Sequence, residues 1–331
     1  MAATILLVVA DSECRKNWRE LLADQGYKII EIGTGERVLD LCPHLSPDLV
    51  LIDAHLPDVS GFEVCRRLKS DPRSKHTPVV LITMLSDDRD SSEAHAAGAD
   101  DFWGSHPSRW EALTRVRSLL QLKSYIDEQS EAVIVSLARS IEGRDPYTQG
   151  HCERIAILAA KLGNRIGLRD DQCEALRLAG MVHDIGKVVV PDAILLKPGR
   201  LNFEEMQVIK QHPAEGERIC SPLKSLRRVL PIVRHHHERM DGSGYPDGLR
   251  GEKIPLTARI LQIADIYDAL TTDRPYREGL SLQRALETMY EEADRGWLDI
   301  ELVKIFGTFA VTPKTMNAME SQWQFGKSGV N

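Results

Sequence analysis

The sequence lacks the features that mark secreted and membrane-spanning proteins. The apolar N-terminal stretch MAATILLVVA has neither the basic start nor the cleavage site of a signal peptide, and it is too short to cross a bilayer. No other stretch approaches the length of a membrane span. The six cysteines are scattered without paired spacing, which is typical of reduced thiols and not of a disulfide framework. We therefore expect a cytoplasmic protein without membrane attachment.

A basic excess and visible internal repeats are also absent. The formal net charge is -7, so the chain lacks the positive surface that a nucleic-acid polymer requires. This charge does not exclude a small phosphate ligand held by a metal ion and a few arginines. With 331 residues, 42% of them hydrophobic, the chain is long enough for two domains that each bury a core.

The first part of the chain alternates short apolar runs with helical patterns. The runs are typical of strands buried on both faces. The expected strands are Ile5–Val9, Tyr27–Ile32, Leu49–Ile52, Val79–Thr83 and Asp101–Trp103. Five such units predict a doubly wound, flavodoxin-like parallel sheet, in which functional groups gather beyond the carboxyl ends of the strands. Asp53 follows the third expected strand at this edge.

The segment PDLVLIDAHLPDVSGFEVCRRLK, which contains Asp53, resembles the phosphoacceptor segment of response-regulator receiver domains. The resemblance aligns Asp53 with the phosphorylated aspartate and Thr83 with the hydroxyl residue at the end of strand four. We expect this receiver-like domain to span residues 1–122. The alternative interpretation is that Asp53 is only a polar residue at the end of a strand.

Two parts of the receiver pattern are missing. Where receivers carry an acidic pair that holds magnesium, this chain has Val9 and Ala10, with Asp11 one place beyond. Where receivers carry a lysine after strand five, Ser105 or His106 stands. Phosphoryl transfer to a carboxylate needs positive charge on the phosphoryl oxygens. We therefore expect a pseudo-receiver that is not efficiently phosphorylated and that serves in dimerisation or docking.

Residues 107–142 carry a helical pattern without a Pro-, Gly- or Ser-rich linker. We expect a continuous or nearly continuous helix between the two domains. One interpretation is a helix that transmits a change between domains or forms a homodimer seam. The other is a plain connecting helix with one buried stripe.

The second half of the chain is helical in its pattern and rich in potential metal ligands. Apolar residues recur at spacings of three and four, which predicts an all-α bundle. Aspartates at positions 184 and 265 accompany six histidines. These histidines are His151, His183, His212, His235, His236 and His237. Imidazoles and carboxylates from different helices of a bundle are the usual ligands of a buried metal site.

Five segments of this half resemble the HD-GYP domain, a branch of the HD superfamily of metal-dependent phosphohydrolases. They are RDPYTQGHCER (144–154), MVHDIGKVVVPDAIL (181–195), KQHPAEG (210–216), HHERMDGSGYPDGL (236–249) and ILQIADIYDALTTDRPYR (260–277). The resemblance implies an all-α HD-superfamily helical bundle and a phosphodiesterase that acts on cyclic di-GMP. We expect this domain over residues 123–312, followed by a tail at 313–331.

Carried over onto this sequence, the resemblance implies two metal ions. The ligands of the first ion are His151, His183, Asp184 and Asp265. The ligands of the second are His212, His236 and His237, together with a bridging Asp184. A shared anion offsets the repulsion between two cations and fixes their separation. His235 precedes the family's histidine pair and is expected to be a bystander.

The donor types also bear on the number and kind of metal ions. Some family members hold a third metal through a glutamate, but Tyr147 stands at that position, so we expect a binuclear site. Mixed imidazole and carboxylate ligands favour iron or manganese, with zinc and nickel as alternatives.

The resemblance further implies residues that act on the substrate. Asp184 and Lys187, one helical turn apart, are the candidate catalytic residues, with an exposed lysine at a helix end as the alternative for Lys187. The candidate substrate-binding residues are Tyr245, Arg274, Arg277 and Asp268. For Asp268, orientation of the site and simple capping of the neighbouring structure are the other interpretations.

These features together predict a hydrolase that converts cyclic di-GMP to pGpG, or further to GMP, under control of the N-terminal domain. One alternative is a catalytically weak cyclic di-GMP receptor or interaction scaffold. Another is a hydrolase of a different cyclic dinucleotide, such as a mixed GMP–AMP ring. Diguanylate cyclases, sensor proteins and a second copy of the chain are the candidate protein partners.

Overall fold

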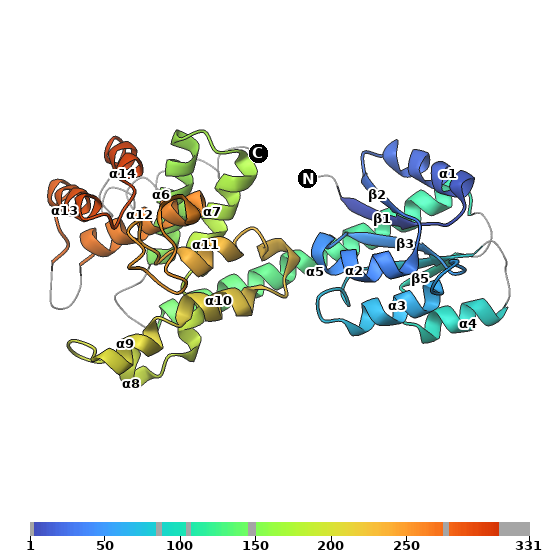
Figure 1. Ribbon diagram of the computed structural model, residues 1–331, viewed down its shortest axis with the longest axis horizontal. Coiled ribbons are helices and arrows are strands. Elements are labelled where there is room, and N and C mark those ends of the chain that lie inside the picture. The colour runs from blue at the N-terminus through green and yellow to red at the C-terminus, as the bar shows by residue number, and fades with distance from the viewer. Residues whose placement is uncertain (1–2, 84–87, 104–106, 145–149, 274–277, 311–331) are drawn as a thin grey trace, which may run out of the picture. The chain divides into compact units, whose positions relative to one another are not determined.

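The computed structural model describes residues 3–83, 88–103, 107–144, 150–273 and 278–310. The chain divides into two compact units, Met1–Gln129 and Ser130–Asn331. The domain boundary expected after residue 122 stays a prediction. Figure 1 shows a sheet with helices in the first unit and helices alone in the second, so the predicted fold class is confirmed for both parts.

The described residues of the first unit form one parallel sheet. Its strands are β1 (Thr4–Val8), β2 (Lys28–Ile32), β3 (Leu49–Asp53), β4 (Val79–Ile82) and β5 (Asp101–Trp103). The order β2-β1-β3-β4-β5 is that of a doubly wound fold, with a crossover helix between successive strands. Strands β1, β3 and β4 are apolar and buried almost throughout, as expected for strands covered by helices on both faces.

Helices cover both faces of this sheet. They are α1 (Ser12–Ala23), α2 (Gly35–Leu45), α3 (Gly61–Ser70), α4 (Asp88–Ala96) and the first part of α5 (Arg109–Glu142). One core joins the sheet to α2, α3 and α4, and another joins the opposite face to α1 and α5. In the second core Trp18 stacks on Trp103, with ring centroids 5.5 Å apart.

The loop after β3 returns tightly to the sheet. Gly61 starts α3, and a Cβ atom there would lie 2.2 Å from the backbone oxygen of Asp53. Only glycine fits such an approach. The close contact therefore fixes Asp53 at the carboxyl edge of the sheet, where the sequence placed it.

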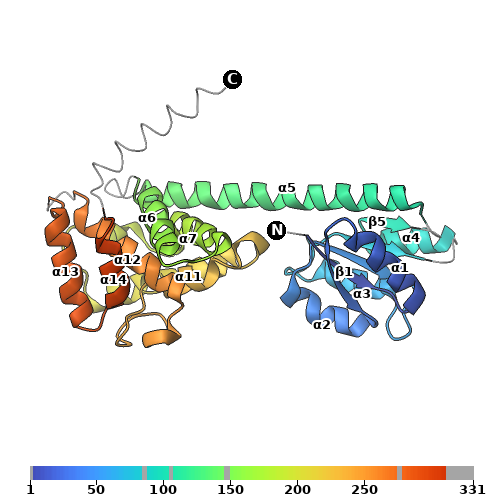
Figure 2. The same ribbon diagram turned by 90° about the horizontal axis from the view of Figure 1, so that it is seen from above.

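Helix α5 is one continuous helix from Arg109 to Glu142, which confirms the expected helix across the junction (Figure 2). Its last turns belong to the second unit. There Ala138 is buried in the core, and Ile134, Val135 and Ile141 pack against it. In the described part of the chain, no helix is long and apolar enough to cross a membrane.

The second unit is a bundle of helices around a single core. The α-helices after α5 are α6 (His151–Arg165), α7 (Asp170–Val182), α8 (Asp192–Leu195), α9 (Phe203–Ile209), α10 (His212–Cys220), α11 (Leu230–His235), α12 (Leu256–Thr271), α13 (Leu282–Asp294) and α14 (Ile300–Gly307). Short 3-10 helices are η1 (Ile185–Val189), η2 (Lys224–Leu226) and η3 (Gly251–Lys253). Fully buried Tyr267 and Phe306 pack edge to face where α12 meets α14.

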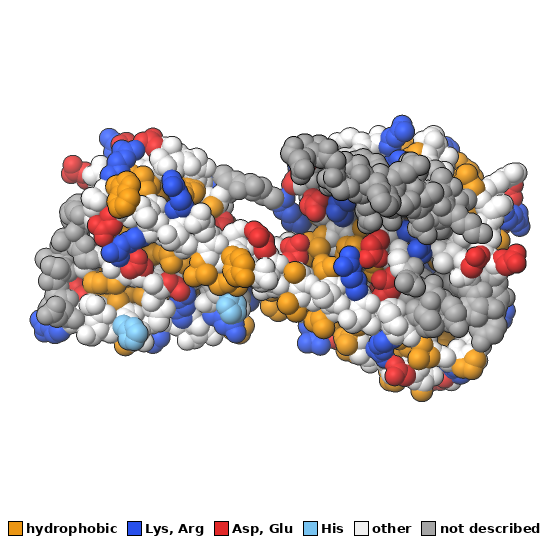
Figure 3. Space-filling model, turned by 180° about the vertical axis from the view of Figure 1, so that it is seen from behind, with side chains coloured by type: hydrophobic (Ala, Val, Ile, Leu, Met, Phe, Trp, Pro, Cys, Tyr) orange, Lys and Arg blue, Asp and Glu red, His pale blue; other side chains and the backbone are white. Residues whose placement is uncertain are grey.

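Acidic and basic side chains are interspersed on the face of the molecule drawn in Figure 3. Neither sign gathers there into a continuous patch, which is consistent with a modest net charge of -7.

Candidate metal centre

The candidate ligands of the second unit lie at the ends of helices. His151 is the first residue of α6, and His212 is the first residue of α10. His183 and His236 each cap the C-terminal end of a helix, α7 and α11 respectively. Asp265 is the exception, because it lies within α12. The ligands thus come from five separate helices that converge on one place.

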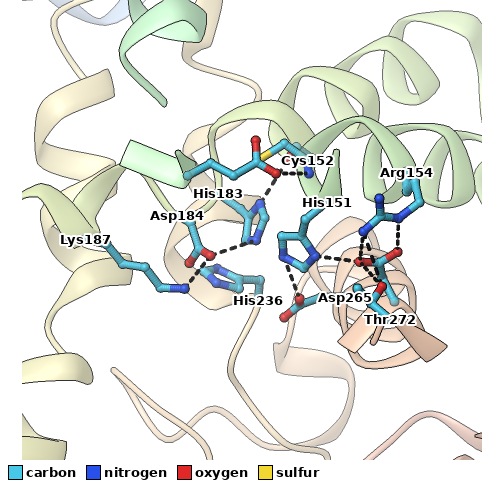
Figure 4. A network of polar contacts seen from close by, with 12 residues as sticks. His151, Cys152, Arg154, His183, Asp184, Lys187, His236, Asp265 and Thr272 are labelled. Carbon is cyan, nitrogen blue, oxygen red and sulfur yellow. Dashed lines mark hydrogen bonds and ion pairs between the residues drawn. The ribbon is translucent and has the colours of Figure 1, made fainter. Parts of the chain in front are cut away.

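The structure brings these side chains into two groups. The first group is His151, His183 and Asp265, and the second is Asp184, His212, His236 and His237. Within each group, one ligand atom of every member lies within 4.8 Å of the others. All seven residues predicted to hold metal therefore fall into the two groups. Figure 4 shows several of them pointing toward one another from different elements.

Asp184 lies between the two groups. Its Oδ2 is 3.4 Å from Nε2 of His183, and its Oδ1 is 3.2 Å from Nε2 of His212. Each carboxylate oxygen thus faces a different group. This is the arrangement that a bridging carboxylate requires.

Backbone carbonyls fix the orientation of three of the rings. Nδ1 of His183, His212 and His236 lies 2.9, 2.8 and 2.7 Å from a carbonyl oxygen. The carbonyls belong to Gly180, Ile209 and Val233. A carbonyl only accepts, so Nδ1 carries the proton in each ring and Nε2 presents a lone pair to the centre.

The inward atoms have the pattern of a cation site. Nε2 of His212 and Nε2 of His236 lie 3.3 Å apart, and two lone pairs cannot bond to each other. Nε2 of His183 and Oδ1 of Asp184 are buried and make no hydrogen bond within the protein. A buried acceptor without a donor is costly. A divalent cation in each group would satisfy these atoms, so the residues present fit bound metal ions.

The ionisation of His236, His237 and Asp184 suits metal binding. Burial, together with the neighbouring His212 ring, lowers the pKa of His237 to about 3, so the ring is neutral. Burial also lowers the pKa of His236 well below its usual value. Burial alone would raise the pKa of Asp184, but Lys187 and His183 hold it well below its usual range. Neutral imidazole and ionised carboxylate are the forms that bind metal. Burial alone would lower the pKa of His183, but the Asp184 carboxylate raises it to about 9, so binding of a cation by Nε2 of this ring releases a proton.

Asp268 lies behind His151. Its Oδ2 accepts a hydrogen bond from Nδ1 of His151 at 2.7 Å, and its Oδ1 accepts one from Nε of Arg154 at 2.6 Å. Only 1% of Asp268 is exposed. This position argues against the substrate-binding role and favours the orienting role, because the carboxylate faces the far side of the ring and leaves Nε2 toward Asp265.

Arg154 and Glu238 were not found by sequence reasoning. Arg154 is 6% exposed and neutralises Asp268. Glu238 is fully buried, and its two oxygens accept hydrogen bonds from the backbone N–H groups of Asp247 and Leu249. The signal for each was its place in a motif, since Arg154 is three residues after His151 in HCER and Glu238 directly follows His237 in HHER.

The glycine-rich loop packs on this same segment. A Cβ atom at Gly244 would lie 2.4 Å from Cα of Glu238, so no other residue fits without a backbone shift. The loop places the Tyr245 ring 4.9 Å from the His237 ring, measured between centroids. Nζ of Lys210 lies 5.3 Å from the centroid of the Tyr245 ring. Tyr245 therefore borders the second ligand group.

Lys187 lies beside the bridging carboxylate, with Nζ 2.5 Å from Oδ2 of Asp184. Burial alone would lower the pKa of Lys187, but the Asp184 carboxylate raises it above the usual value, so the amine stays charged. The alternative of an exposed lysine at a helix end does not match this contact. Arg274, Arg277 and Tyr147 lie outside the described residues.

A third cluster, His235, Glu238 and Asp247, also has metal-ligand residue types. Its carboxylates are already engaged, because Glu238 accepts from backbone N–H groups and Asp247 pairs with Arg234 at 2.7 Å. This agrees with the interpretation of His235 as a bystander.

In the first unit, the surroundings of Asp53 differ from those of Asp184. Oδ1 of Asp53 accepts the backbone N–H of His55 at 2.9 Å, and burial raises its pKa. Asp11 caps α1 by accepting the backbone N–H of Cys14 at 2.7 Å. Among the described residues, the groups of potential ligands close enough to hold a cation all lie in the second unit.

Thr83 is also engaged at this edge. Its Oγ1 lies 3.3 Å from Oδ2 of Asp90, which is in turn 3.4 Å from Nε2 of His55. Ser105 and His106, which stand in place of the receiver lysine, lie outside the described residues. The weak phosphorylation of Asp53 therefore stays a prediction.

Family models match both parts of the chain. The response regulator receiver domain matches residues 5–104, and the HD domain matches residues 136–302. The chain is 33% identical to the cyclic di-GMP phosphodiesterase response regulator RpfG of Xanthomonas campestris, a match that covers 89% of this chain and 85% of that protein. It is 32% identical to a cyclic di-GMP phosphodiesterase of Thermotoga maritima, covering 85% of this chain and 84% of that one.

Another relative carries a different substrate in its name. The chain is 34% identical to 3'3'-cGAMP-specific phosphodiesterase 3 of Vibrio cholerae, over 60% of this chain and 41% of that protein. These two long matches and both family models agree with the two folds of the chain. The chain therefore belongs to the family of cyclic di-GMP phosphodiesterase response regulators, in which a receiver domain is joined to an HD domain.

Proposed function

We propose that the second unit hydrolyses a phosphodiester bond of cyclic di-GMP and releases pGpG, using two divalent cations. The observation that carries the proposal is the meeting of the two ligand groups at Asp184, one carboxylate oxygen toward each. The names of the full-length relatives support the substrate. Iron or manganese suits the mixture of imidazole and carboxylate donors.

When bound, such a pair of cations supplies positive charge to the phosphate and lowers the pKa of an attacking water. The chain's own residues do the rest. The two carboxylate oxygens of Asp184 fix the position of one ligand group relative to the other. Lys187, fixed by its contact with Asp184, keeps a positive charge beside the position of the phosphate and stabilises the charge that builds up there.

Tyr245 is proposed to contact the nucleotide, because the centroid of its ring lies 4.9 Å from that of His237 and 6.5 Å from that of His212, two members of the second ligand group. Arg274 and Arg277 are proposed to bind phosphate and guanine. The receiver-like unit is proposed to regulate this activity without phosphorylation of Asp53, since the acidic pair and lysine of receivers are missing from the sequence.

The mixed GMP–AMP ring is a second candidate substrate, favoured by the match to a relative named for 3'3'-cGAMP. Both rings present the same phosphodiesters to the metal centre. They differ in one purine, so a direct comparison of rates separates the two candidates.

The test is product analysis by chromatography after anaerobic loading with iron or manganese. Wild type, Asp184→Ala and the control Asp294→Ala, an exposed aspartate on α13, are each incubated with cyclic di-GMP and with the mixed ring. We expect metal-dependent pGpG from wild type and control, and none from Asp184→Ala. Absence of product from wild type that contains two metal ions per chain would refute the enzyme and leave a receptor or scaffold.

A further inference from the structure

The end of α5 is tied to the start of α6 by two polar contacts. Oε1 of Glu142 accepts the backbone N–H of Cys152 at 3.1 Å. Nε of Arg139 lies 3.0 Å from Oε1 of Glu153. Cys152 and Glu153 directly follow His151, the residue with which α6 begins. Two residues in the first turn of α6 therefore contact α5, Cys152 through Glu142 and Glu153 through Arg139.

Helix α6 has no cap of its own. The residue before it, Gly150, has no side chain and adopts a φ of 75°. The first N–H groups of a helix have no partner within the helix and need an acceptor from outside. Glu142 supplies that acceptor, and a carboxylate at this end is also favoured by the helix dipole.

The last turn of α5 also forms part of the wall of the candidate metal centre. A cavity of about 30 Å³ is lined by Ala138, Ile141 and Glu142 from α5 and, on the other side, by His151, Cys152, Asp184 and Lys187 among others. Cys152 is 3% exposed, and its hydrogen bond with Glu142 is partly buried. Figure 4 shows Cys152 beside His151 and His183.

We infer that Glu142 is a positioning residue for the metal centre. By capping α6 it fixes His151, and with it the group His151, His183 and Asp265. The inference rests on the proposed function, because it assigns Glu142 an effect on the first of the two cations. Since α5 begins at Arg109 in the first unit, a displacement of this helix along its axis would act on His151 through the same contact.

The test measures metal affinity, not activity. Metal-free full-length protein is titrated with Mn²⁺, and free Mn²⁺ is followed by electron paramagnetic resonance. Glu142→Ala removes the acceptor and Glu142→Gln keeps one. Glu131→Ala, a glutamate of the same helix away from its C-terminal end, is the matched control. His151→Ala identifies which of the two ions belongs to the first group.

We expect wild type and Glu131→Ala to bind two ions. In Glu142→Ala the ion that is lost in His151→Ala binds about tenfold more weakly, while the other is unchanged. Glu142→Gln stays within about threefold of wild type, because a neutral acceptor replaces a charged one. Circular dichroism of the metal-free variants verifies that each is folded.

Unchanged binding of both ions in Glu142→Ala would overturn the inference and leave the proposed function intact. Equal weakening in Glu142→Ala and Glu142→Gln would also overturn it, because the hydrogen bond to α6 would not be the cause. Equal weakening of both ions would overturn the assignment to the first group. A wild-type protein that binds no Mn²⁺ would overturn the proposed function as well.

Discussion

Replacing Asp268 with asparagine should weaken both the fold and the metal centre. The carboxylate accepts hydrogen bonds from His151 and Arg154, and both donors are buried. Asparagine keeps one acceptor oxygen but turns an N–H donor toward the other partner. Arg154, which is 6% exposed, then lacks the negative charge that balances it.

The structure indicates the size of the effect. Removing one partner of a buried ion pair costs about 3–5 kcal/mol, and the retained oxygen of asparagine places Asp268→Asn near the lower end. For a domain of this size that is a fall in melting temperature of roughly 6–12 °C. Loss of the hydrogen bond that orients His151 should weaken binding of the first cation by about 10–100-fold.

The assay is urea unfolding of the metal-free chain followed by circular dichroism, beside Mn²⁺ titration. Because the chain has two compact units, the transition that responds to Asp268→Asn belongs to the second unit. The exposed Asp294→Asn is the control, with stability and affinity unchanged. Adding Arg154→Met removes the unpaired charge, so the double variant should recover stability and still bind metal weakly.

A loss of stability below about 1 kcal/mol together with wild-type affinity would refute the reasoning. It would mean that Asp268 is needed neither to compensate the buried charge of Arg154 nor to orient the ring of His151.

Three further predictions concern other parts of the chain. Asp58 accepts the backbone N–H groups of Gly35 and Glu36 at the start of α2, so Asp58→Ala should cost about 1 kcal/mol at pH 7 in urea unfolding. These bonds lower the pKa of Asp58 to about 2. The difference in the free energy of unfolding between wild type and Asp58→Ala should therefore be full above pH 4 and shrink as the pH falls toward 2. A difference that grows in acid would contradict this prediction. Gly244→Ala should destabilise the second unit and abolish phosphodiesterase activity, whereas Gly307→Ala, where the nearest atom to a new Cβ is 3.4 Å away, should do neither. Asp53 should remain unmodified by acetyl phosphate in intact-mass measurements, and a stable phosphoryl adduct absent from Asp53→Asn would show the prediction to be wrong.

The fold was predictable where burial is uniform. Strand β3 and its neighbours are short apolar runs, and no end of an expected strand differs from the observed end by more than one residue. The bounds of α4 (Asp88–Ala96) were harder to predict, because its polar sequence offers little periodicity to fix its start. A continuous α5 was predictable because nothing in residues 107–142 interrupts the helical pattern.

The candidate ligands were predictable because they lie in local motifs. The contacts that orient these ligands were not predictable, because they join segments far apart in the sequence. Asp268 shares a helix face with Asp265, and this spacing was compatible with a role in substrate binding, in orienting the site or in capping. Its partners His151 and Arg154 are 117 and 114 residues away in the sequence. Only the packing of α6 against α12 reveals that Asp268 lies behind the ring of His151. The same holds for Glu142, whose contact with α6 depends on how two helices meet.

A carboxylate near the end of a strand or helix can bind a metal ion only if the neighbouring side chains supply further ligands. Asp53 accepts the N–H of its near neighbour His55, and the hydroxyl of Thr83 is directed to Asp90. Asp184 instead faces ring nitrogens whose protons are held on the opposite side by backbone carbonyls. A divalent cation bound in each ligand group can satisfy those lone pairs together. The candidate chemistry of the chain therefore lies in the second unit, and the contact of Glu142 with α6 is one point at which α5 can affect the position of a ligand.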